Sequence, residues 1–429
     1  MRRDARSLER QFLLLWLCSA AVVTFIRLLH ATDIGYDTTL QIQAGQHLLE
    51  GKGLSVYWPT ADDLAQPLTL ELLTQFSSGY SLYTAALAVF GIDEGVLVKV
   101  AGAPVTLLGW LGWARLGFTY MSSGIRQSGI WRFAGMWIAI VSPVLFTSRW
   151  GGTDILLWAA IPWILELIMR PSQAREHSVI RYDLFAGLLI GLCVLMRYAS
   201  VFVAAYAILV IVWQCRRQTA RAVRRLVALT AGMLPALVIQ GYINSLAGPD
   251  NVFVPGSITI GWDLLPSAIG RALESLTTLA LANQVFLFWV PGRLQLWTDT
   301  AYEPATLTLA GISFIVLPVV FASVHRVSIA KWSDDVRTAA AGLLIVLPVF
   351  LWVCGLFGTF NYLRQFRYYE SLRPLAVFIA FFFAAIKVGN ADARIRILAM
   401  SGRVYLLAFM LATAVEVAFI FVPHPSGEA

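Results

Sequence analysis

The chain has 429 residues, of which 58% are hydrophobic, and its mean hydropathy is +0.71. Because the apolar residues come in continuous runs long enough to cross a bilayer, they exclude a soluble protein, and their lack of alternation excludes a transmembrane β-barrel. The net charge of +7 comes from basic residues spread through short loops, which follows the positive-inside rule and indicates no nucleic-acid partner. We therefore predict an all-α polytopic membrane protein.

The first span is predicted at residues 12–29, after an arginine-rich N-terminus. No small-residue cleavage site precedes Asp33, so the segment is interpreted as an uncleaved signal-anchor with a cytoplasmic N-terminus. Residues 30–94 then form a first extracytoplasmic loop, in which Lys52 is the only lysine or arginine against eight carboxylates.

A short amphipathic helix that lies along the membrane surface is predicted directly after Asp37. Its apolar face carries Leu40, Ala44 and Leu48, and the side chains expected to turn away are Gln41, Gln43, Gln46 and Glu50. Gly51 and Gly53 are expected to end it, because glycine tolerates the left-handed conformation of a helix end. On this local pattern alone, Asp37 is an N-cap. Residues 80–90 are apolar but too short to cross, which predicts a re-entrant or juxtamembrane helix.

Further spans are predicted along the rest of the chain, at 95–118, 132–148, 155–169, 182–213, 226–243, 304–325, 338–357, 373–387 and 404–422. The stretch 182–213 is interrupted by Arg197 and Tyr198, and an arginine at mid-bilayer is costly. We therefore expect two helices of about 15 residues that meet at an outer turn, with Arg197 in a cavity below the outer surface. The total is about 11 helices, with the C-terminus extracytoplasmic.

The loops between these spans set the predicted topology. Residues 214–225 and 388–402 are basic and are expected in the cytoplasm. The long loop 244–303 is expected outside, and its apolar piece 276–290 is not expected to cross, because a crossing would place the basic loop 388–402 outside. No separate soluble domain is predicted. The four cysteines, Cys18, Cys193, Cys215 and Cys354, show no CxxC spacing and are interpreted as small hydrophobic residues.

With this topology, unusual charged residues map to the outer ends of several helices. They are Asp33, Asp37, Arg149, Asp154, Arg197, Arg364, Arg367 and Glu370. Ionisable groups at membrane depth are functional candidates, because their desolvation must be compensated. Each one alone also fits a charge that snorkels to the interface.

Four segments, taken in order, resemble the GT-C glycosyltransferases, a class that includes protein O-mannosyltransferases and lipid A aminoarabinose transferases. Residues 37–54 resemble the first-loop motif, with Gln41 where the family has tyrosine. FSSGYSLYTAALAVFG resembles the Pro-Pro-Gly-Tyr helix, with two serines in place of the prolines. GLLIGLCVLMRYA (187–199) resembles the pattern of glycines and leucines before a basic residue. RQFRYYESLRP (364–374) resembles the late Arg-Tyr-Tyr element.

The resemblance implies a GT-C-like bundle in the bacterial plasma (inner) membrane. It would move a sugar from a polyprenyl-phosphate donor to a lipid, glycan or protein acceptor at the extracytoplasmic face. Asp37 matches the general base and Asp154 a second acidic residue, while arginines suit the donor phosphate. The substrate-binding candidates are Asp33, Arg149, Arg197, Tyr198, Arg364, Arg367 and Tyr368.

Several alternatives stay open at this point. The tyrosines also fit an interfacial aromatic belt. No cofactor is certain, although Asp37 together with Asp154 could hold a divalent cation. A transporter or lipid flippase would also place charges in a membrane cavity, but such proteins often carry internal repeats, and none is found here. A non-catalytic assembly subunit would tolerate the loss of Asp37.

Overall fold

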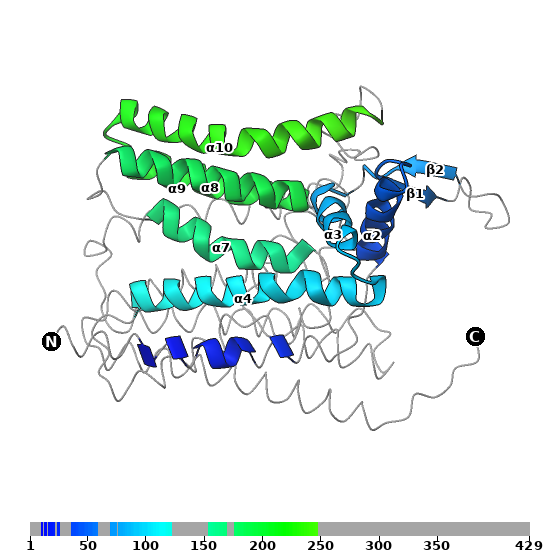
Figure 1. The fold of residues 1–429 in the computed structure, drawn as a ribbon. Coiled ribbons are helices and arrows are strands. Elements are labelled where there is room, and N and C mark those ends of the chain that lie inside the picture. Colours follow the sequence, from blue (N-terminus) through cyan, green and yellow to red (C-terminus); the bar gives the residue numbers. More distant parts are fainter. Residues whose placement is uncertain are drawn as a thin grey trace, which may run out of the picture.

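In the computed structural model, the described residues are 36–58, 69–74, 76–121, 153–169 and 176–247, together with most residues between 10 and 25. This part of the chain is mostly helical, and its long helices lie side by side (Figure 1). The elements are α2 (Tyr36–Leu49), β1 (Ser55–Trp58), β2 (Thr69–Leu72), α3 (Gly79–Val89), α4 (Glu94–Met121), α7 (Thr153–Met169), α8 (Glu176–Met196), the 3-10 turn η2 (Tyr198–Ser200), α9 (Val201–Gln214) and α10 (Thr219–Ser245).

Three of these helices are long and apolar enough to cross a membrane. The segments are Val96–Thr119, Ser178–Met196 and Thr219–Ser245, and two shorter apolar helices, Ile155–Met169 and Val201–Gln214, accompany them. The helical class predicted from the sequence is confirmed for the described residues, and the apolar helices are consistent with insertion in a membrane. The predicted spans 132–148, 304–325, 338–357, 373–387 and 404–422, and the segment 276–290, lie outside the described residues.

The bundle has two distinct ends. Helices α4 and α7 start together, because Leu97 packs in one cluster with Leu156 and with Met196, the last residue of α8. The end that holds this cluster, α2, α3 and the β1–β2 hairpin is called the loop end (Figure 1). The opposite end, at the 215–218 turn between α9 and α10, is called the turn end. Helices α2 and α3, the β1–β2 hairpin and the turn at 197–200, which were predicted to share one side of the membrane, thus lie at the loop end.

Glycines bring α8 and α10 into close contact. A Cβ on Gly187 would clash with the carbonyl oxygen of Leu229, and a Cβ on Gly191 would lie 3.0 Å from the Cα of Met233. Gly187 and Gly191 are four residues apart and so lie on one face of α8. Small residues at this spacing let two backbones approach closely within a membrane.

Two predicted boundaries around α8 and α10 are wrong. Helix α8 has 21 residues, because it begins at Glu176, so only α9, with 14 residues, has the expected length. The loop 214–225 is in fact a four-residue turn at 215–218, and α10 continues through the arginines that follow. In both places a helix continues through charged residues that were assigned to a loop: those before residue 182 in α8 and the arginines of the start of α10. The ion pair with Asp183 accounts for one of them, the buried Arg225.

The first loop folds as predicted in part. Helix α2 ends as expected: Gly51 has φ +77°, its N–H donates to the Leu48 carbonyl, and the Lys52 N–H donates to the His47 carbonyl, which is the Schellman pattern. The expectation that Gln41 turns away is wrong, because Gln41 is buried. The reason is that α2 packs on more than one face: Leu40 and Ala44 belong to one apolar cluster and Ile42 to another.

The first loop also contains the helix α3 and the β1–β2 hairpin. The helix predicted over 80–90 is confirmed as α3, which has 11 residues. Strands β1 and β2 form an antiparallel pair that the sequence analysis did not predict, with Val56 opposite Glu71. Val56 of β1 is buried against α2, and Ser55 before it is also buried, while Tyr57 is exposed.

Candidate functional site

The loop end collects the described residues that were predicted to act. Helix α2 carries Asp37 in its first turn, since Asp37 is the second residue of the helix. Behind it, Leu40 and Ala44 pack with Leu73 and with Ile243 of α10. The start of the Asp37 helix is thereby attached to the bundle rather than held by a loose loop.

Close backbone contacts join α2, α3 and α8. A Cβ on Gly45 would lie 2.6 Å from the Ser81 carbonyl oxygen, so α2 approaches α3 to a distance that no larger residue permits. A Cβ on Gly79 would lie 2.5 Å from the Leu195 carbonyl oxygen at the end of α8. Close packing against α8 therefore requires glycine at position 79, in the segment that resembles the Pro-Pro-Gly-Tyr helix. The two glycines fix the first loop against the residues that lead into Arg197.

Helix α8 stops directly before Arg197, where the sequence predicted a break. The Arg197 N–H donates to the Cys193 carbonyl at 2.8 Å, and its own carbonyl accepts from the Ser200 N–H at 2.9 Å, so the chain turns here before α9 begins. The Arg197 side chain is half-buried. A half-buried guanidinium at the junction of two apolar helices can reach an anion at the bundle surface, whereas the same group at mid-helix would meet only apolar atoms.

A network of uncharged polar side chains surrounds the neighbouring residue, Tyr198. Gln240 of α10 accepts hydrogen bonds from the N–H and the hydroxyl of Ser78, each at 2.9 Å, and donates to the Tyr198 hydroxyl at 3.0 Å and to Asn244 at 2.7 Å. The Tyr198 hydroxyl lies 3.2 Å from the Asn244 side-chain oxygen and 3.4 Å from the Thr74 carbonyl, two acceptors that it can donate to. The network ties α10, η2 and the start of α3 together.

This network changes the description of Tyr198. Burial raises the pKa of the Tyr198 phenol, and the hydrogen bond to Asn244 opposes that rise. The phenol is therefore a neutral donor at physiological pH. Its hydroxyl bonds within the protein, and the role of Tyr198 in substrate binding stays a prediction. Sequence reasoning missed Gln240 and Asn244. The available signal was two amides one turn apart in the C-terminal half of α10, which carries no charged residue.

Other predicted site residues lie outside what the structure describes. The side chains of Asp37 and Asp154 are not described, although Asp154 lies in the first turn of α7, at the loop end. The remaining candidates outside the described residues are Asp33, Arg149, Arg364, Arg367 and Tyr368. Within the described part of the chain, no group of three His, Cys, Asp or Glu could hold a metal ion. The divalent cation considered for Asp37 and Asp154 stays a prediction.

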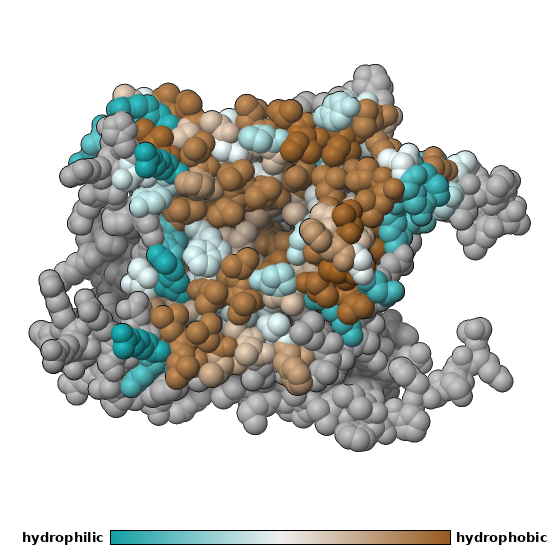
Figure 2. Space-filling view, in the orientation of Figure 1, coloured by the Kyte–Doolittle hydropathy of each residue, from teal (hydrophilic) through white to brown (hydrophobic). Residues whose placement is uncertain are grey.

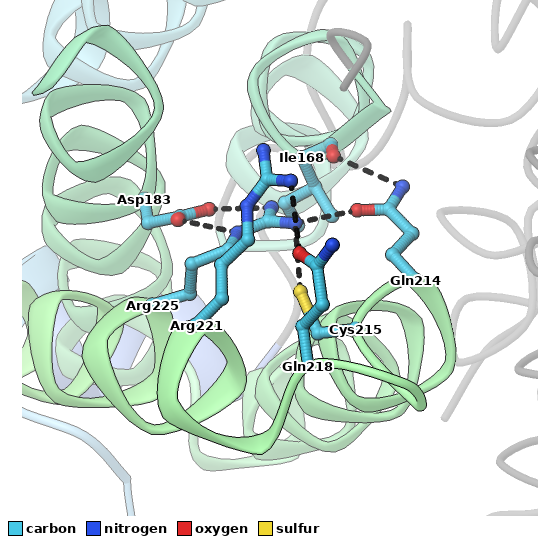
Figure 3. Close-up of polar contacts among 7 residues, drawn as sticks. All are labelled: Ile168, Asp183, Gln214, Cys215, Gln218, Arg221 and Arg225. Carbon is cyan, nitrogen blue, oxygen red and sulfur yellow. Dashed lines mark hydrogen bonds and ion pairs between the residues drawn. The ribbon is translucent and has the colours of Figure 1, made fainter. Parts of the chain in front are cut away.

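The turn end is built differently, around a buried ion pair (Figure 3). The Arg225 guanidinium donates to both carboxylate oxygens of Asp183, at 2.7 and 2.9 Å, and to the Gln214 side-chain oxygen at 2.7 Å. Gln214 in turn donates to the Ile168 carbonyl at 3.5 Å. Removing one partner of such a pair typically costs about 3–5 kcal/mol, since the other charge stays buried. The pair therefore joins α8 to α10 and, through Gln214, reaches α7.

A second ion pair lies on the neighbouring helices. Arg115 of α4 donates to Glu166 of α7 at 2.7 Å, with the arginine half exposed and the glutamate nearly buried. Neither ion pair was among the predicted site residues, and each joins two helices, α8 with α10 and α4 with α7. Of the predicted site residues, the structure describes the side chains of Arg197 and Tyr198, and both lie at the loop end.

Comparison with known proteins adds no assignment. No family model, curated protein or solved structure matches the chain.

Proposed function

We propose that the chain is a membrane glycosyltransferase of the GT-C type, which transfers a sugar from a polyprenyl-phosphate donor to an acceptor at the extracytoplasmic membrane face. One observation carries the proposal. The helix that carries Asp37 in its first turn is packed at the same end of the bundle as the turn that carries Arg197. A carboxylate and an arginine at one end of an apolar bundle suit a reaction between a hydroxyl and a lipid-linked phosphate sugar.

The proposed chemistry assigns one task to each side chain. Attack of the acceptor oxygen on the anomeric carbon breaks the bond between that carbon and the donor phosphate oxygen, and the lipid phosphate leaves with the electron pair. Asp37 takes the proton of the acceptor hydroxyl as the general base. Arg197 binds the donor phosphate, because a guanidinium makes bidentate hydrogen bonds to its oxygens and compensates the charge that develops on the leaving group.

The uncharged network gives this site a rigid support. Gln240 bonds to Ser78 at the start of α3 and to Tyr198, the residue after Arg197. A turn held by such bonds keeps Arg197 at a constant distance from the first loop, which a reaction between two bound substrates requires.

The proposal is tested by replacing Asp37 with asparagine. Asp37→Asn keeps the size of the side chain and its capacity to cap a helix but cannot take the proton, so the rate of transfer should fall by roughly 10²–10⁴. The assay follows label from a polyprenyl-phosphate sugar into acceptor in reconstituted vesicles, with the amount of inserted protein measured in parallel.

Asp93→Asn is the matched control. Asp93 is exposed and directly precedes α4 in the same loop, where its carbonyl accepts from the Val96 and Leu97 N–H groups. This variant should keep wild-type transfer. Full activity of Asp37→Asn at wild-type abundance, or an equal loss in both variants, would make Asp37 a structural residue of the first turn of α2 and remove the proposed mechanism.

A further inference from the structure

The α9–α10 turn carries a dense positive charge. No Asp or Glu occurs between Asp183 and Asp250, while five arginines lie in the 13 residues from Trp213 to Arg225. Arg225 is buried and neutralised by Asp183. The other four, which we call the arginine patch, are Arg216, Arg217, Arg221 and Arg224. The buried carboxylate of Asp183 pairs with Arg225, and the sequence segment that carries the patch contains no other carboxylate side chain.

The patch is accessible. Arg216, Arg217 and Arg224 are exposed, and Arg221 is half-buried. Arg221 lies one helical turn before Arg225 and donates to Gln218 at 3.3 Å, so its guanidinium is held beside that of Arg225 (Figure 3). Two adjacent guanidinium groups share a single carboxylate here. An additional anion at this place would gain electrostatic energy from both.

Apolar side chains border the patch. Trp213 is 40% exposed, Val223 54% and Val227 61%. The Arg216 guanidinium lies over the Trp213 ring, 5.3 Å from its centroid. Figure 2 shows the hydrophilic corner at the turn end next to the hydrophobic face of the helices. A strip of cations beside a tryptophan and apolar helix faces matches the layered chemistry of a bilayer surface, where phosphate lies just above hydrocarbon.

We propose that the arginine patch binds the phosphate headgroups of anionic phospholipids in the adjacent membrane leaflet. Arginine offers phosphate a bidentate fork, and the apolar border allows the acyl chains of the same lipid to lie along α9 and α10. A soluble polyanion such as RNA would use the arginines but not the apolar border, so the lipid fits both features. The Asp183–Arg225 pair holds the turn in place, and both of its side chains are buried, so the headgroup contacts the four arginines of the patch.

The test titrates the purified full-length chain, in neutral detergent micelles, with short-chain phosphatidylglycerol or phosphatidylcholine, and counts bound lipid by native mass spectrometry. Wild-type protein should bind phosphatidylglycerol more tightly than phosphatidylcholine. The triple variant Arg217→Gln, Arg221→Gln, Arg224→Gln should lose roughly fivefold in affinity per arginine, on the order of 100-fold in total. Loss of arginines can change the orientation of the chain in a membrane. In micelles both sides of the protein are accessible, so lipid binding is measured independently of that orientation.

Three controls keep the result interpretable. Lys52→Gln removes an exposed cation at the loop end and should leave lipid binding unchanged. Replacing the same three arginines with lysine keeps the charge and should keep an affinity between those of the wild type and the glutamine variant. Soluble glycerol phosphate should compete only weakly, because it lacks acyl chains.

Several results would overturn the proposal. Equal binding of the two lipids by the wild type, or wild-type affinity in the glutamine variant, would show that the patch is not a headgroup site. Glycerol phosphate that binds as tightly as the lipid would assign the patch to a soluble anion.

Discussion

Arg197 is the residue whose chemistry is easiest to separate from its structural role. It ends α8 through its backbone, and its half-buried side chain lies at the loop end. Arg197→Lys keeps the charge but loses the bidentate fork, so transfer should fall less steeply than in Asp37→Asn. Arg197→Ala should raise KM for the polyprenyl-phosphate donor by roughly 10- to 100-fold, the loss expected for a charged hydrogen bond. The measurement is initial rate against donor concentration in vesicles.

A matched replacement shows whether that effect belongs to the site. Lys52→Ala removes another cation at the loop end, on an exposed turn where Lys52 pairs with Glu50. It should leave KM for the donor unchanged. If Arg197→Ala retained the wild-type KM, the phosphate would be bound elsewhere.

The sequence predicts the role of a residue where that residue interrupts a local pattern. Arg197 interrupts an apolar run, so its helix break was predictable from the cost of a charge at membrane depth. The role of Gln240, in contrast, depends on a distant residue. Its partner Ser78 lies 162 positions away in the sequence, so no local pattern identifies the hydrogen bond. Gln41 was assigned to the wrong face because the expected helix had one apolar face, while α2 is packed on two.

At the scale of elements, the contact between α8 and α10 makes a sharp prediction. Gly187→Ala places a methyl group against the Leu229 carbonyl, which is backbone and cannot rotate away. The free energy of unfolding should fall by about 1–3 kcal/mol, the usual cost of overpacking. Denaturant titration of the purified protein in micelles measures it. Leu192→Ala, at an exposed position of α8, is the control and should cost less. An unchanged stability of Gly187→Ala would contradict the close packing of these helices.

Element boundaries show what composition can and cannot determine. Helices α3, α4, α7 and α9 lie close to the predicted ranges, because their apolar runs have clear ends. The start of α8 was misplaced by six residues, because charged residues next to an apolar run normally indicate a loop. Arg225, which the sequence analysis assigned to a loop, continues α10 as a buried residue because Asp183 of α8 neutralises it. An ion pair between two helices cannot be predicted from either helix alone. The same holds for the β1–β2 hairpin, which depends on burial of Val56 against α2.

At the scale of the molecule, the two ends differ in chemistry. The loop end is held by amide and hydroxyl groups and carries Arg197, whereas the turn end is held by the Asp183–Arg225 pair and displays the arginine patch. By the positive-inside rule the turn end should face the cytoplasm and the loop end the outside.

This orientation is measurable with introduced cysteines. With the native cysteines replaced, Thr69→Cys in the exposed strand β2 and Arg217→Cys in the turn are exposed to an impermeant thiol reagent in intact cells. We expect labelling of the Thr69 site alone, and labelling of both sites after the membrane is opened. Labelling of the Arg217 site in intact cells would invert the arrangement and place the loop end in the cytoplasm.

The most direct measurement is an experimental structure of the full chain in lipid nanodiscs with a polyprenyl-phosphate sugar added. The account predicts that the donor phosphate lies within hydrogen-bonding distance of Arg197, with its sugar on the side of the Asp37 carboxylate. A donor phosphate bound away from the loop end, or a path for the lipid through the bundle with Asp37 remote from the sugar, would contradict it and favour a transporter.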